Sequence, residues 1–153
     1  MNIATQTTTM HRGEYTITTD KGRLDLVAIH AFLSQAYWSP GVPMPVVERS
    51  IENSLAFGIL RGEEQVGFAR VVTDKATFAY LADVYVLEAH RGRGLSRWLL
   101  EVIQSHAELQ GLRRFLLATK DAHGLYARFG FKELTNPSRM MEKWNPNDYQ
   151  EAP

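Results

Sequence analysis

The chain contains no cysteine among its 153 residues and no apolar run long enough to cross a bilayer. Without thiols, it cannot form disulfide bonds, thiolate nucleophiles or zinc sites built on cysteine. Its charges balance, with 17 Lys and Arg against 17 Asp and Glu, whereas proteins that bind nucleic acids or membrane surfaces usually carry a basic excess. We therefore expect neither nucleic acid nor a membrane as a partner. The histidines lack metal-ligand spacing, so we expect no metal either.

Length and composition indicate one domain with a single core, because hydrophobic residues make up 44% of the chain. The threonine-rich start lacks the basic-then-apolar order of a signal peptide, which makes a cytoplasmic location the default. We divide the chain into a flexible leader over residues 1–13, a folded domain over 14–145 and a polar tail over 146–153.

Alternation and helical spacing of apolar residues predict the elements of this domain. The predicted helices cover residues 24–35, 46–53, 94–110 and 121–129. The predicted strands cover residues 14–19, 55–60, 65–73, 78–87, 115–118 and 139–144. This order places antiparallel hairpins first and a crossover later. The fold class is therefore α/β, with a mixed, mostly antiparallel central sheet flanked by helices.

The most informative segment is the turn at residues 91–96, where a long apolar strand gives way to a helix. Gly92 and Gly94 let successive backbone N–H groups point into one concavity, and the helix N-terminus adds unpaired N–H groups. Arg91 and Arg93 oppose the helix dipole at a cost of ~0.3–1 kcal/mol each, as expected where an anion binds. The turn therefore predicts a pyrophosphate site, with a solvated basic turn as the alternative.

Other phosphate-binding loops fit this turn less well. A P-loop requires Lys and then Ser or Thr after its glycines, but Leu95 and Ser96 follow Gly94 here. A dinucleotide fingerprint requires a third small residue where Arg97 stands, and it should lie early in a βαβ unit. A nucleotide-binding protein of either kind is thus disfavoured.

Two blocks of this chain resemble the GNAT superfamily of N-acetyltransferases. Residues 91–96, Arg-Gly-Arg-Gly-Leu-Ser, resemble the family signature Gln/Arg-x-x-Gly-x-Gly/Ala, with Ser96 departing at the last position. The block that begins at Thr119 is similar to the family's Asn-x-x-Ala-x-x-Leu-Tyr-x-x-x-Gly-Phe, with Thr119 in place of Asn. It matches at Ala122, Leu125, Tyr126, Gly130 and Phe131. The two blocks occur in the family's order and spacing.

The resemblance implies a GNAT-like fold and the transfer of an acetyl group from acetyl-CoA to a primary amine of a small molecule or peptide. The amine would attack directly, through a tetrahedral intermediate. The implied cofactor-binding residues are Val84, Val86, Arg91, Gly92, Arg93, Gly94, Leu95, Ser96, Thr119 and Tyr126. A non-catalytic acetyl-CoA-binding regulatory module is the alternative. We also keep a homodimer open as an assembly state.

The same resemblance gives Tyr126 the role of general acid. A phenol with a pKa near ~10 can protonate a departing thiolate whose parent thiol has a pKa near ~8.5. The alternative is a tyrosine that only packs in the core. The family would place the oxyanion donor at the backbone N–H of Val84 or Tyr85. That donor requires a β-bulge, which the sequence does not reveal.

Three further residues are candidates for the acceptor site. Asp83 lies in an apolar strand, where a carboxylate is costly unless it has a partner. It either holds or deprotonates the acceptor ammonium, or it forms a buried salt bridge, for instance to Arg70. Tyr37 and Trp38 precede a proline-rich loop, and either wall the acceptor site or cap the core. These residues do not specify which amine is acetylated.

Overall fold

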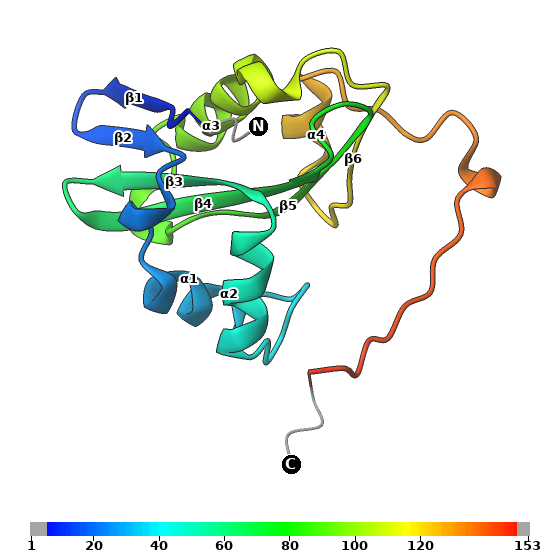
Figure 1. The fold of residues 1–153 in the computed structure, drawn as a ribbon, viewed down its shortest axis with the longest axis horizontal. Helices are drawn as coiled ribbons and strands as arrows, with labels where there is room; N and C mark the ends of the chain where they lie inside the picture. The colour runs from blue at the N-terminus through cyan, green and yellow to red at the C-terminus, as the bar shows by residue number, and fades with distance from the viewer. Residues whose placement is uncertain (1–5, 150–153) are drawn as a thin grey trace, which may run out of the picture.

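The computed structural model describes residues 6–149, which form one six-stranded sheet with strands in the order β1 to β6 (Figure 1). Strands β1 to β5 are antiparallel to their neighbours, and β6 runs parallel to β5. The strands are β1 Thr9–Arg12, β2 Tyr15–Thr18, β3 Leu55–Arg61, β4 Glu64–Thr73, β5 Phe78–Val86 and β6 Arg114–Leu117. The predicted fold class, a single α/β domain with a mixed, mostly antiparallel sheet, is confirmed.

Helices cover both faces of the sheet (Figure 1). Helices α1 (Leu26–Leu33) and α2 (Met44–Glu52) pack on one face, where they bury a core that includes Phe68 and Tyr85. Helices α3 (Leu95–Ser105) and α4 (His123–Ala127) pack on the other face. Helix α3 is also the crossover that parallel pairing of β5 and β6 requires. Its apolar stripe is buried: Leu95, Trp98, Leu99, Leu100, Val102 and Ile103.

Strand β5 contains a β-bulge opposite β4. Phe68 of β4 pairs with Tyr85, and Arg70 pairs with Ala82, so one β4 residue faces two β5 residues, 83 and 84. Asp83, the first of these two, has a φ of 57°. An extra residue on one strand shifts which face the following side chains occupy.

That shift is visible in the packing of β5. Leu81, before the bulge, belongs to the core under α3 and α4. Tyr85, four residues later, belongs to the core under α1 and α2, although strict alternation would place it with Leu81. The bulge therefore lets one strand contribute aromatic surface to the side of α1 and α2 and aliphatic surface to the side of α3 and α4.

Strands β5 and β6 stay together for only part of the length of β5. Their pairing runs from Phe78 and Arg114 to Leu81 and Leu117, whereas β5 continues to Val86. The last five residues of β5 therefore have no partner in β6, and this divergence opens the cleft described below.

The structure corrects several predicted element ends. The strand predicted over 139–144 is wrong, because a 3-10 helix, Pro137–Arg139, precedes irregular backbone in which Met141 and Trp144 are 96% and 73% exposed. Strand-forming side chains make a strand only where a neighbour supplies packing and hydrogen bonds. Thr9–Arg12 of the predicted leader form β1, because their backbone pairs with β2. Residues 1–5 of that leader and 150–153 of the predicted tail lie outside the described residues.

Three helices are shorter than predicted, and α1 is one of them, spanning Leu26–Leu33 rather than residues 24–35. Helix α3 ends at Ser105, since the ring of His106 caps a separate 3-10 turn, Ala107–Leu109. Helix α4 spans five residues, and Thr119 Oγ1, rather than the Asp121 carboxylate, accepts the hydrogen bond from the Ala122 amide at 3.1 Å. Within residues 6–149, no helix has the length and apolarity to cross a membrane.

Candidate active site

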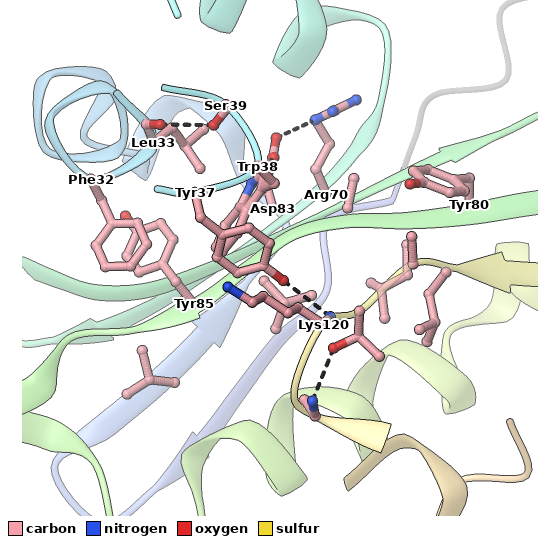
Figure 2. Close-up of a pocket in the computed structure, with 18 of the residues that line it drawn as sticks. Phe32, Leu33, Tyr37, Trp38, Ser39, Arg70, Tyr80, Asp83, Tyr85 and Lys120 are labelled. Atoms are coloured by element: carbon pink, nitrogen blue, oxygen red, sulfur yellow. Dashed lines mark hydrogen bonds and ion pairs between the residues drawn. The ribbon is translucent and has the colours of Figure 1, made fainter. Parts of the chain in front are cut away.

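A cleft of about 710 Å³ opens where β5 and β6 diverge (Figure 2). The end of β5 and the start of α3 line one part, and the loop between α1 and α2 lines the other. Residues 117–122, after β6, form the opposite wall. The cleft gathers most of the predicted site residues: Tyr37, Trp38, Asp83, Val84, Val86, Arg91, Ser96, Thr119 and Tyr126. The remaining ones, Gly92, Arg93, Gly94 and Leu95, connect Arg91 to Ser96.

The turn before α3, which the sequence predicts to bind an anion, is built around two glycines. Gly92 and Gly94 adopt left-handed φ angles of 77° and 75°, which glycine reaches without steric cost. Gly94 caps α3 without a side-chain hydrogen bond, so no cap occupies the first N–H groups of the helix. Arg91 Nε donates to the carbonyl oxygen of Val86 at 2.9 Å and ties the turn to the end of β5.

A buried aromatic pair supports this turn from within. The hydroxyl of Tyr15 on β2 and Nδ1 of His90 form a hydrogen bond of 2.9 Å, and both side chains are buried. His90 immediately precedes Arg91, so this pair fixes the entry to the turn. The sequence analysis missed it, because no local pattern links two residues 75 positions apart.

Tyr126 lies in α4, is only 8% exposed and lines the cleft. Burial raises the pKa of the Tyr126 phenol, and the nearby Tyr37 and Asp121 act in the same direction. The hydroxyl is therefore kept in its protonated form, which is the form that can donate a proton.

Asp83 lies where β5, β4 and the loop between α1 and α2 meet, and its side chain is 11% exposed. Its Oδ2 accepts a hydrogen bond from Arg70 Nε at 2.9 Å, and its Oδ1 accepts one from Trp38 Nε1 at 2.9 Å. The salt bridge to Arg70, one of the two alternatives for this residue, thus exists. Asp83 also lines the cleft, and each carboxylate oxygen retains a further lone pair for a ligand.

Tyr37 and Trp38 form an aromatic wall over the cleft (Figure 2). They are 54% and 41% exposed, so they do not cap the core. Their loop is anchored by Ser39 Oγ, which donates to the carbonyl oxygen of Leu33 at 2.7 Å. The Tyr37 hydroxyl accepts a hydrogen bond from the Lys120 amide at 3.2 Å and so spans the cleft to the loop after β6.

Other cleft residues carried no signal in the sequence. Lys120 lies inside the second motif block at a variable position, and its Nζ is 5.4 Å from the centre of the Tyr37 ring. Phe32 of α1 stacks on Tyr85, with ring centroids 3.8 Å apart. Tyr149 reaches the cleft from the predicted tail. Among residues 6–149, no group of three or more His, Asp or Glu side chains is arranged to hold a metal ion.

Comparisons with known proteins agree with this geometry. Residues 26–131 match the sequence model of the Acetyltransferase (GNAT) family. A Gibberella zeae protein whose name assigns it to the acetyltransferases is 34% identical over an alignment of 146 positions, and the match covers 80% of this chain and 81% of that protein.

Solved structures give the same result. A crystal structure of a GNAT-family protein from Xanthomonas campestris pv. campestris is 49% identical, with a TM-score of 0.88 over 90% of this chain and 97% of that one. A Clostridium acetobutylicum structure determined with acetyl-CoA is 16% identical, with a TM-score of 0.64 over 86% of this chain and 94% of that one, and shows the shared fold alone.

Proposed function

Because the chain belongs to the GNAT acetyltransferase family, we propose that it transfers the acetyl group of acetyl-CoA to a primary amine of a small molecule or peptide. One observation carries the proposal: a single cleft joins the glycine-rich turn at the start of α3, a buried phenol and a bulged strand to an aromatic wall. A binding module needs the turn, but it needs neither the phenol nor the second half of the cleft.

The cofactor half of the cleft suits a long, polar thioester. In the proposal, the pyrophosphate binds the backbone N–H groups of residues 91–96, with Arg91 and Arg93 adding positive charge. The pantetheine arm pairs with the backbone of Val84 and Val86. The support is that β6 no longer pairs with this part of β5. Its backbone groups on that side therefore remain available, apart from the Val86 carbonyl, which accepts from Arg91 Nε. Thr119 lies on the opposite wall.

In the proposed reaction, the neutral amine attacks the thioester carbonyl carbon and a C–N bond forms. A backbone N–H at the bulge, that of Val84 or Tyr85, donates to the oxyanion. When the C–S bond breaks, Tyr126 donates its proton to the CoA thiolate, and the proton that the new amide nitrogen releases returns to the Tyr126 oxygen through water. Asp83 uses its remaining lone pairs to hold the incoming ammonium and to accept its proton, directly or through water.

Two measurements test the proposal. Thermal melting with acetyl-CoA, CoA, ATP and NAD in parallel should show stabilisation by the first two, because a ligand at 100 times its Kd adds about 2.7 kcal/mol. CoA release is then measured with amines, amino acids, peptides and polyamines. Stabilisation without CoA release from any acceptor would favour the regulatory module. No stabilisation by acetyl-CoA or CoA would contradict both functions.

The cytoplasmic location and the homodimer remain predictions. Fractionation of cells that produce the chain tests the first. Sedimentation analysis of the purified protein tests the second.

A further inference from the structure

The carboxylate of Asp83 connects three elements: its own strand β5, the neighbouring strand β4 and the loop between α1 and α2. Arg70 reaches it from β4, and Trp38 reaches it from the loop between α1 and α2, each at 2.9 Å (Figure 2). The Arg70 and Asp83 side chains are 18% and 11% exposed, so water competes little for this pair. Arg70 is held on its other side, where Nη1 donates to Ser54 Oγ at 3.3 Å.

Asp83 also has an unusual backbone conformation. Its φ of 57° lies in the left-handed region, which residues other than glycine rarely adopt. Lys75 is the other non-glycine residue with a positive φ among residues 6–149, and it lies in the turn between β4 and β5. Asp83, in contrast, lies within a strand. Such a conformation persists where surrounding contacts impose it.

The conformation of Asp83 matters because it forms the bulge. The extra residue is left out of the β4–β5 ladder, and it sets the face on which Tyr85 lies. Tyr85 then stacks on Phe32 of α1. A change at Asp83 would therefore move both the backbone at the centre of the cleft and the aromatic side of the acceptor site.

We propose that Arg70 is a positioning residue for acetyl transfer. Through the fork of its guanidinium, it holds Asp83 in the left-handed conformation, and Asp83 in turn fixes the bulge and the Trp38 wall. Arginine suits this role because Nε and Nη1 bind two partners in one plane, which the single ammonium of lysine cannot reproduce. The inference rests on the proposed function, since the bulge offers the proposed oxyanion donor.

Arg70→Lys separates positioning from charge compensation, because it keeps the positive charge and loses the fork. We expect a fall in kcat of about tenfold or more, as one well-aligned hydrogen-bonded contact is lost, with the Kd of acetyl-CoA changed by less than about threefold. Arg61→Lys is the matched control, because Arg61 forms a solvent-exposed pair with Glu14 and neither residue lines the cleft. An Arg70→Lys enzyme with wild-type kcat would overturn the proposal. So would an equal loss in Arg61→Lys.

A second pair of variants tests the backbone directly. Asp83→Gly and Asp83→Ala both remove the carboxylate. Any contribution of that carboxylate to holding the amine is therefore lost to the same extent in the two variants. Only glycine adopts a φ near 57° without steric cost. If the conformation of residue 83 matters, Asp83→Gly should retain about tenfold more activity than Asp83→Ala. Equal activities would show that this conformation is irrelevant to the reaction.

A third readout needs no acceptor and thereby separates this proposal from the proposed function. The backbone amides of Val84 and Tyr85 are followed by NMR in the wild type and in Arg70→Lys. We expect their resonances to shift and their hydrogen exchange to accelerate in the variant, with amides of β2 unchanged. If the wild type releases no CoA with any acceptor, the proposed function fails, while shifted amides still support the inference that Arg70 positions Asp83 and the bulge. Unchanged amides in Arg70→Lys would overturn that inference.

Discussion

The two halves of the cleft are built in different ways. The half proposed to bind acetyl-CoA, here the cofactor half, consists mainly of the backbone of one continuous segment, from the end of β5 through the turn at residues 91–96. The half proposed to bind the amine, here the acceptor half, is assembled from side chains of separate segments: Tyr37, Trp38, Arg70, Asp83 and Lys120. A backbone-based site tolerates many side chains, whereas a side-chain-based site changes with each substitution. A short motif can therefore identify the co-substrate while saying little about the amine.

The position of Tyr126 between the halves gives the largest expected effect. Phenylalanine keeps the ring and its packing but removes the proposed acid, so Tyr126→Phe should lower kcat by roughly 10²–10⁴-fold. The Kd of acetyl-CoA should stay near the wild-type value. Because burial raises the pKa of Tyr126, the wild-type rate should be lost only at a pH above the ordinary range of a tyrosine, and this alkaline limb should vanish in the variant.

Wild-type kcat in Tyr126→Phe, under conditions where chemistry limits the rate, would show that Tyr126 is a packing residue. Solvent would then be the source of the proton. Steady-state rates read with the pH profile decide between the two.

A glutamate in the turn tests the cofactor half by itself. Gly94→Glu places a negative charge where the pyrophosphate is proposed to bind. Like charges about 4 Å apart repel by a few kcal/mol near a protein surface, so the affinity for acetyl-CoA should fall by about 10²-fold. Calorimetry measures this loss.

Gly111→Glu is the matched control for that variant. Gly94 and Gly111 have φ angles of 75° and 70°, and a Cβ built on either meets no described atom within 4 Å. Both variants therefore carry the same backbone cost of ~1–2 kcal/mol, but Gly111 follows α3 at its far end. Equal acetyl-CoA affinities in the two folded variants would contradict the proposal that the pyrophosphate binds at residues 91–96.

The smallest expected effect belongs to the acceptor wall. Trp38→Phe keeps an aromatic ring over the cleft but removes the N–H that donates to Asp83. One exposed hydrogen bond is worth about 0.5–1.5 kcal/mol, so we expect the acceptor KM to rise about three- to tenfold, with the acetyl-CoA KM unchanged. Trp144→Phe, at a residue 73% exposed in the C-terminal segment, is the control. If Trp38→Phe changed the KM of acetyl-CoA instead, the cofactor half and the acceptor half of the cleft would not act independently.

Local patterns predicted the elements that carry their own signal. The strands β3, β4 and β5 and helix α3 were found within a few residues, because each combines a clear hydrophobic period with a glycine or polar boundary. Strand β1 was missed because it depends on pairing with β2 rather than on its own side chains, all of which are exposed. The false strand at 139–144 is the converse case, in which suitable residues found no partner strand within residues 6–149.

The sequence by itself determined the turn proposed to bind phosphate, because the glycines, the arginines and the helix start that form it are consecutive residues. Only the tertiary structure decided which side chains contact Asp83. Its strand, its Arg70 partner and its Trp38 partner come from three segments, and their meeting depends on the register of β4 against β5. A register is a property of two strands, and neither strand alone records where the extra residue of the bulge will fall.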